Sequence, residues 1–146
     1  MFRKLLTTDN DRTTILLRLT LAVVLFPHGA QKVLGWFGGS GFSGTMDFFT
    51  SNMGIPAVLA FLAILAEFLG PLGLVSGLLT RVAAFGIGVT MTVAAFFHKG
   101  HGFFMNWFGN QQGEGFEYHL LAIGLALALV IKGGGAWSLD RKIAKG

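Results

Sequence analysis

Four apolar stretches set the hydrophobic pattern of this 146-residue chain. They cover about residues 14–34, 57–79, 82–97 and 117–132, and polar or glycine-rich segments separate them. A helix needs about 20 apolar residues to cross the hydrocarbon core of a bilayer, a length that these stretches reach or approach. The pattern predicts an all-α fold, a polytopic four-helix membrane bundle that forms a single domain over residues 1–146.

The segments between the apolar stretches predict two long loops and one tight turn. Residues 36–56 and 98–116 are rich in glycine and aromatic side chains, which is typical of the membrane interface. Within the first loop, residues 45–52 have the pattern of a short interfacial helix. Only residues 80–81 separate the second and third stretches, so we expect these stretches to form an antiparallel hairpin.

The first apolar stretch is predicted to remain in the protein as a membrane span rather than to act as a signal peptide. It contains Arg18 and His28, and it is longer than the apolar region of a signal peptide. No compact cleavage site of small residues follows it.

The composition agrees with a membrane protein and limits the chemistry that the chain performs alone. Hydrophobic residues make up 53% of the sequence and charged residues 12%, which is outside the usual composition of a soluble domain. The 22 glycines predict close packing of helices. The absence of cysteine excludes disulfides and thiol chemistry in this chain, so a redox role requires a cofactor or a partner.

The net charge of +4 predicts an orientation in the membrane rather than an affinity for nucleic acid. Most basic residues lie before the first stretch, between the second and third, and at or after the end of the fourth. These are Arg3, Lys4, Arg12, Arg81, Lys132, Arg141, Lys142 and Lys145. Since basic loops stay in the cytoplasm, we expect both ends of this chain there and the two aromatic loops on the outer side.

Ionisable residues inside the apolar stretches mark a candidate functional site. Glu67 lies near the middle of the second stretch, and Pro71, four residues later, cannot donate a hydrogen bond to its carbonyl. Arg18, His28 and Lys32 fall on one stripe of the first helix, which we expect to face the bundle. Glu67 is therefore predicted either to pair with Arg18 or Lys32 as a structural contact, or to bind a ligand or protons.

All four predicted helices place an ionisable side chain at a similar depth in the outer half of the membrane. With a rise of 1.5 Å per residue, these groups lie about 18–25 Å from the cytoplasmic ends of their helices. The candidates for ligand binding or proton handling are Arg18, His28, Lys32, Glu67, Glu117 and His119. The candidates for metal binding are His28, His98 and His119. Simpler interpretations stay open, namely an interfacial pair for His28 and Lys32, interfacial histidines at positions 98 and 101, and, for Glu117, a first-turn acid favoured by the helix dipole.

Several motifs, taken in order along the chain, resemble the DoxX family. They are Arg18 in the first stretch, Gly-Ala-Gln-Lys at residues 29–32, Glu-Phe-Leu-Gly-Pro-Leu-Gly at 67–73, Gly-Leu-Leu-Thr-Arg at 77–81, His98, Glu117, and Gly-Gly-Gly-Ala-Trp-Ser-Leu-Asp at 133–140. The resemblance implies a bacterial inner-membrane protein of four helices, in a family whose members are often labelled oxidoreductases. It also implies a link to DoxD in thiosulfate:quinone oxidation, and to membrane complexes with superoxide dismutase and a sulfurtransferase.

Three functions are compatible with these residues. The first is a redox subunit that binds a quinone or a similar aromatic molecule, because histidine, lysine and carboxylate groups suit hydrogen bonding to carbonyl oxygens and proton transfer. The second is a scaffold without enzymatic activity, whose loops recruit a soluble redox enzyme. The third is a haem- or metal-binding protein, or a small transporter formed as a homo-oligomer. The expected partners are thus the lipid bilayer, a soluble redox enzyme or further copies of the chain.

Overall fold

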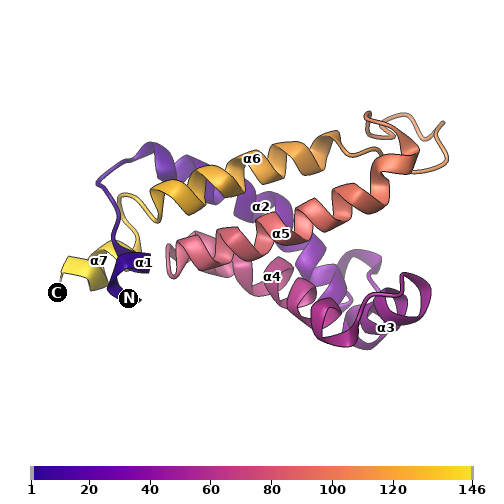
Figure 1. Cartoon of the computed structure of the whole chain (residues 1–146), viewed down its shortest axis with the longest axis horizontal. Helices are drawn as coiled ribbons and strands as arrows, with labels where there is room; N and C mark the ends of the chain where they lie inside the picture. The colour runs from indigo at the N-terminus through magenta and orange to yellow at the C-terminus, as the bar shows by residue number, and fades with distance from the viewer. Residues whose placement is uncertain (1, 146) are drawn as a thin grey trace.

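Four long helices run along the longest dimension of the protein in the computed structural model, which describes residues 2–145 (Figure 1). They are α2 (Thr13–Leu34), α4 (Ala57–Ser76), α5 (Thr80–His98) and α6 (Glu117–Lys132). Shorter helices flank them: α1 (Phe2–Leu6), η1 (Trp36–Gly38), α3 (Gly41–Asp47), η2 (Phe48–Asn52), η3 (Lys99–His101) and α7 (Leu139–Lys145). No strand occurs among the described residues, and the all-α fold is confirmed.

Three helices are long and apolar enough to cross a membrane, judged over the part of the chain that the structure describes. They span Thr13–Leu34, Ala57–Ser76 and Thr80–His101. Helix α6 has 16 residues, fewer than the length of about 20 that a bilayer requires, so its crossing of the membrane stays a prediction. Large apolar side chains such as Leu16 and Phe85 are exposed on the outside of the helices, as expected for a surface that contacts lipid.

The long helices pack as successive neighbours, α2 on α4, α4 on α5 and α5 on α6, and α2 also contacts α6. The buried core that they share includes Leu21, Leu25, Leu74, Ala84, Ile87, Met91, Ala126 and Leu129. The inward face of α4 includes Glu67, Gly70 and Leu74, which are all buried. The carboxylate of Glu67 therefore lies inside the protein rather than toward lipid.

The turn between α4 and α5 lies slightly before its predicted position. Helix α4 ends at Ser76 because Gly77 adopts a left-handed conformation with φ 66°, and α5 begins at Thr80. The carboxylate of Asp140 accepts hydrogen bonds from the backbone N–H groups of Leu79 and Thr80, at 2.6 and 2.8 Å. These bonds satisfy donors at the start of α5 that the helix itself leaves free. A residue 60 positions away thus helps to set the boundary.

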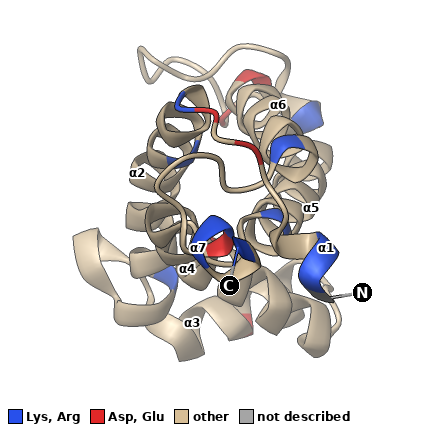
Figure 2. Ribbon diagram, turned by 90° about the vertical axis from the view of Figure 1, so that its left-hand side faces the viewer, with Lys and Arg blue, Asp and Glu red and all other residues tan. Residues whose placement is uncertain are grey.

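The segments near the two ends of the chain meet at one end of the bundle (Figure 1). Part of the basic segment that follows α6 folds into α7, whose Asp140 N–H donates to the Gly77 carbonyl at 2.9 Å. Arg18 also lies here, only 2% exposed, with Nη2 3.5 Å from the Ala136 carbonyl. Lys and Arg residues are prominent on α1 and α7 in the view along the bundle (Figure 2). We call this the basic end of the bundle.

Candidate functional site

An ion pair between Lys32 of α2 and Glu67 of α4 forms the centre of the candidate site. Lys32 Nζ lies 2.6 Å from Glu67 Oε2, and Glu67 is only 5% exposed. A charge buried to this degree costs several kcal/mol when it has no partner. Lys32, and not Arg18, is therefore the base that pairs with Glu67.

The backbone around the ion pair explains why α2 and α4 approach each other at this level. Gly29, one turn before Lys32, lies against the backbone carbonyl of Glu67, and a side chain at position 29 would collide with that carbonyl. The same carbonyl lacks its usual donor within the helix because Pro71 has no N–H. Close approach through a small residue is a common mode of packing between membrane helices, and here it brings Lys32 within reach of Glu67.

His28 and Tyr118 stand beside the ion pair. Their ring centroids are 6.2 Å apart. The charges of Lys32 and Glu67 both act on His28, and the charge of Glu67 acts on Tyr118. The hydroxyl oxygen of Tyr118 is buried and has no hydrogen-bond partner among the described residues, whereas His28 is exposed. The group thus has a buried side at Tyr118 and an edge at the surface of the bundle.

His119 of α6 continues this group of polar rings toward α5. Its ring stacks on His98, with centroids 4.8 Å apart and planes 26° apart, and Tyr118 lies on another side at 5.4 Å. The ring interacts with the Phe116 carbonyl, but no hydrogen bond of ordinary geometry reaches the buried Nδ1 of His119 from the residues described. His98 Nδ1 lies 3.0 Å from the Glu114 carbonyl oxygen. We call the four rings of His28, Tyr118, His119 and His98 the polar ring row, which leads from the ion pair to the second long loop.

Two residues predicted for the site lie elsewhere. Arg18 precedes Lys32 by 14 residues on one helix, about 21 Å along its axis, and belongs to the basic end of the bundle. Position on a common stripe gives a direction around the helix and not a depth along it. Glu117 Oε1 accepts hydrogen bonds from the Met105 N–H and the Trp107 indole N–H, at 2.9 and 3.1 Å. Its carboxylate therefore holds the loop between α5 and α6 in shape.

The histidines that the sequence suggested as metal ligands are not gathered into a cluster of metal ligands in the described part of the chain. Within residues 2–145, no group of three His, Cys, Asp or Glu side chains is arranged to hold a metal ion. His98 and His119 stack face to face, an arrangement that does not point a nitrogen of each ring at one ion.

Tyr118 is not among the residues that the sequence pattern indicated, although the structure places it within the polar ring row. A neutral phenol at the start of an apolar helix carries no charge signal. The available signal was its position in the chain, directly between the candidates Glu117 and His119. A buried tyrosine hydroxyl usually requires a hydrogen-bond partner, so a tyrosine beside two polar candidates is itself a candidate for a polar site.

These features define an all-helical integral membrane protein with a polar site inside its bundle. The chain belongs to the DoxX family, whose family model matches residues 13–100. The matched range contains His28, Lys32, Glu67 and His98, and it ends before α6, which supplies Tyr118 and His119.

Two relatives cover most of the chain. "Inner membrane protein YqjF" of Escherichia coli (strain K12) is 36% identical over 112 residues, which are 76% of this chain and 81% of that protein. "Putative oxidoreductase CatD" of Bacillus subtilis (strain 168) is 32% identical over 133 residues, 91% of this chain and 88% of that protein. No solved structure matches the chain significantly. The relatives agree with the family that the motifs predicted and with a location in a membrane.

Proposed function

We propose that this protein is the membrane subunit of a redox system and binds a quinone, or a similar small aromatic molecule, between the Lys32–Glu67 ion pair and the polar ring row. The observation that carries the proposal is the presence there of two buried polar atoms that have no hydrogen-bond partner among residues 2–145, the Tyr118 hydroxyl and Nδ1 of His119. Buried polar groups nearly always have a hydrogen-bond partner, and one left without it costs about 1–3 kcal/mol. A ligand with hydrogen-bonding oxygens would supply the missing partners.

The residue types of the site suit a quinone in particular. A quinone carries two carbonyl oxygens on a flat apolar ring and, with two electrons and two protons, becomes a quinol. In this proposal the Tyr118 hydroxyl and the His119 ring each donate a hydrogen bond to a carbonyl oxygen. Glu67 and His28 are the groups that pass protons, and the Lys32 ammonium holds the Glu67 carboxylate in position. The electrons come from a soluble electron-transfer protein.

The position of His28 suits a ligand that arrives from the bilayer. His28 is exposed on α2, one of the helices long enough to cross the membrane, while Glu67 and His119 are buried. A membrane-soluble molecule would therefore reach the ion pair by moving between helices rather than through an aqueous channel.

We further propose that the chain, as a single domain, lies in a bacterial inner membrane with its basic end in the cytoplasm. Eight of the eleven Lys and Arg residues of the chain lie at this end, either outside the apolar stretches or, for Lys132, at the last residue of the fourth. Only Lys32 and Lys99 lie toward the other end. Positively charged segments remain on the cytoplasmic side, which puts the ion pair in the outer half of the membrane.

The test is a calorimetric titration of the purified protein in nanodiscs with a short-chain quinone. Tyr118→Phe removes only the hydroxyl, and we expect binding to weaken about fivefold, the value of one hydrogen bond of about 1 kcal/mol. Thr92→Val is the matched control, because it removes a hydroxyl that bonds the Gly88 carbonyl at 2.8 Å outside the site. Equal affinities of the wild type and Tyr118→Phe, or no binding by either, would contradict the proposal.

A second function, a scaffold for a soluble redox enzyme, is favoured by the loop between α5 and α6. Four large apolar side chains are exposed there, on Phe103, Phe104, Trp107 and Phe108, the last at 89%. Hydrogen bonds from the loop backbone to Glu114 and Glu117 give this aromatic surface a defined shape. Under this hypothesis Phe108→Ser weakens capture of the partner in a pull-down from membranes and leaves quinone affinity unchanged. Glu67→Gln, in contrast, weakens quinone binding and leaves capture of the partner unchanged.

A further inference from the structure

The segment after α6 holds one aromatic side chain outward at the basic end of the bundle. Trp137 has a left-handed backbone conformation, with φ 51°, which is rare for a residue with a bulky side chain. Its neighbours Ala136 and Ser138 are buried, at 1% and 6% exposed, while the Trp137 side chain is 78% exposed. The Ser138 hydroxyl donates to the Gly135 carbonyl at 2.8 Å and accepts from the Arg141 N–H at 3.2 Å. The exposed indole is therefore held in place by a buried backbone on both sides.

Helix α7, which follows Trp137, has an inward face and two different exposed faces. Asp140 points inward and binds the start of α5, which fixes the helix against the bundle. Leu139 and Ile143, one turn apart, are 41% and 51% exposed and form an apolar stripe. The basic residues Arg141 and Lys145 are likewise one turn apart and form a second stripe. A short amphipathic helix of this kind is typical of a membrane surface.

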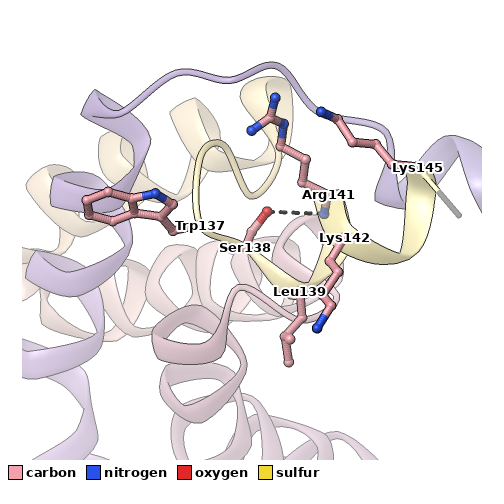
Figure 3. A pocket seen from close by; sticks show the side chains of 6 residues that line it. All are labelled: Trp137, Ser138, Leu139, Arg141, Lys142 and Lys145. Carbon is pink, nitrogen blue, oxygen red and sulfur yellow. Dashed lines mark hydrogen bonds between the residues drawn. The ribbon is translucent and has the colours of Figure 1, made fainter.

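A shallow groove of about 330 Å³ lies between these faces (Figure 3). It is lined by Trp137, Ser138, Leu139, Arg141, Lys142 and Lys145. In Figure 3 the Arg141 and Lys145 side chains extend to one side of α7, and Lys142 extends with Leu139 to the other. Neither Lys142 nor Lys145 forms an ion pair with any of residues 2–145. The groove thus combines uncompensated positive charge with an indole and a leucine.

We propose that this groove binds the phosphate headgroup of an anionic phospholipid. Its basic side chains complement the phosphate, and Trp137 lies beside them as an interfacial anchor for the glycerol region. The exposed Leu139 and Ile143 favour a lipid over free phosphate, because a soluble anion makes no use of an apolar stripe. The groove also lies at the end of the membrane-crossing helices, where lipid headgroups are expected. The proposal is independent of the quinone site, which lies toward the other end of α2.

The experiment uses Trp137 as the reporter in the full chain. Trp36→Phe and Trp107→Phe leave Trp137 as the single tryptophan. Both substituted positions lie beyond the ends of the long helices that are farthest from the basic end of the bundle. The protein is placed in phosphatidylcholine nanodiscs that contain a small fraction of brominated phosphatidylglycerol or, in parallel, of brominated phosphatidylcholine. Bromine quenches tryptophan fluorescence only at short range, so we expect the anionic lipid to quench Trp137 at a much lower fraction than the neutral one.

Paired charge variants test whether the groove is responsible. Each basic side chain near an anionic surface contributes about fivefold to binding, so Lys142→Gln with Lys145→Gln should lower the preference for phosphatidylglycerol about tenfold or more. Lys4→Gln with Lys99→Gln makes the same change in net charge outside the groove and should leave the preference intact. All four lysines are exposed, so the variants should fold.

Three outcomes would overturn the proposal. Equal quenching by the two brominated lipids would mean that the groove has no preference for anionic lipid. An equal loss of preference in both pairs of variants would mean that net charge, and not the groove, attracts the lipid. Release of the lipid by soluble glycerol phosphate at millimolar concentration would identify a site for a free phosphate instead. Native mass spectrometry of the wild type, with phosphatidylglycerol retained more strongly than phosphatidylcholine, gives a second measurement without any substitution.

Discussion

Gly29 of α2 lies directly against the backbone carbonyl of Glu67 in α4, with no room for a side chain between the two helices. This contact sets the distance at which Lys32, one turn further along α2, reaches the Glu67 carboxylate. The ion pair at the centre of the candidate site therefore depends on an uncharged glycine as well as on its two charged residues.

Replacement of Gly29 by alanine should destabilise the protein and separate Lys32 from Glu67. The added methyl group collides with backbone, which cannot move aside as a flexible side chain can, and such overpacking costs about 1–3 kcal/mol. Thermal unfolding in detergent measures the loss. Gly124→Ala is the control, because Gly124 is also helical but faces open space, and alanine there should be neutral or slightly stabilising. Equal melting temperatures of the two variants would contradict the close contact.

The Lys32–Glu67 pair should show energetic coupling in a double-mutant cycle. Glu67→Gln leaves the Lys32 ammonium without its partner, and we expect a loss of about 1–3 kcal/mol, less than for a fully buried pair because Lys32 is partly exposed. Lys32→Met combined with Glu67→Gln should be more stable than Glu67→Gln alone, because no unpaired charge remains. The measurement is thermal unfolding of the two single variants, the double variant and the wild type. Additive effects would mean that the pair does not contribute as a pair.

Asp140 should matter for stability far more than its place near the end of the chain suggests. Asp140→Ala leaves the N–H groups of Leu79 and Thr80 without acceptors and removes a charge that acts on the buried Arg18. We expect a loss of about 2–3 kcal/mol, measured by thermal unfolding. Asp9→Ala, at an exposed position at the same end of the bundle, should change the melting temperature little.

Acid should weaken the contact that joins the start of α2 to the end of α6. The hydrogen bond from Lys132, together with those from Thr13, lowers the pKa of Asp11 below its ordinary value of 3.8. A carboxyl group whose pKa is lower in the folded protein stabilises the fold above its ordinary pKa, and this contribution is lost as the pH falls below that value. We expect the wild type to melt above Asp11→Asn near neutral pH and the difference to shrink toward about pH 3. A difference that stays constant over this range would contradict the contact.

The proposed orientation can be tested with single introduced cysteines, since the chain has none of its own. Ser51, in η2, and Lys145, in α7, are both exposed and lie toward opposite ends of the long helices. We expect a membrane-impermeant maleimide to label Ser51→Cys in intact cells, and Lys145→Cys only after the cells are opened. The reverse pattern would place the basic end outside.

The apolar pattern alone was enough to identify the helical class and the approximate positions of the long helices. The thickness of the bilayer sets the length of a span, and a helix that crosses the hydrocarbon core must present mainly apolar side chains to it. The inward direction of Glu67 also followed from sequence, since a carboxylate at that depth is too costly to face lipid. The outer loop helix was predicted too short: α3 and η2 together cover residues 41–52 rather than 45–52.

The tertiary structure decided how the polar residues are paired. The sequence offered Arg18 and Lys32 equally as partners of Glu67, and only the packing of Gly29 on the Glu67 carbonyl places Lys32 at the correct depth. Glu117 had the right depth for the site, but its carboxylate holds Trp107 and the loop instead. Tyr118 lies in the site although it carries no charge that would have marked it in the sequence.

What the sequence determined by itself was therefore the set of elements that bury apolar surface in a membrane, because that signal is local, periodic and repeated along each helix. What only the tertiary structure decided were the contacts between helices distant in sequence, such as Asp140 with the start of α5 and His119 with His98. Those contacts depend on the register and rotation of packed helices. A single sequence does not encode either quantity in any local pattern, since both arise from the combined fit of many side chains.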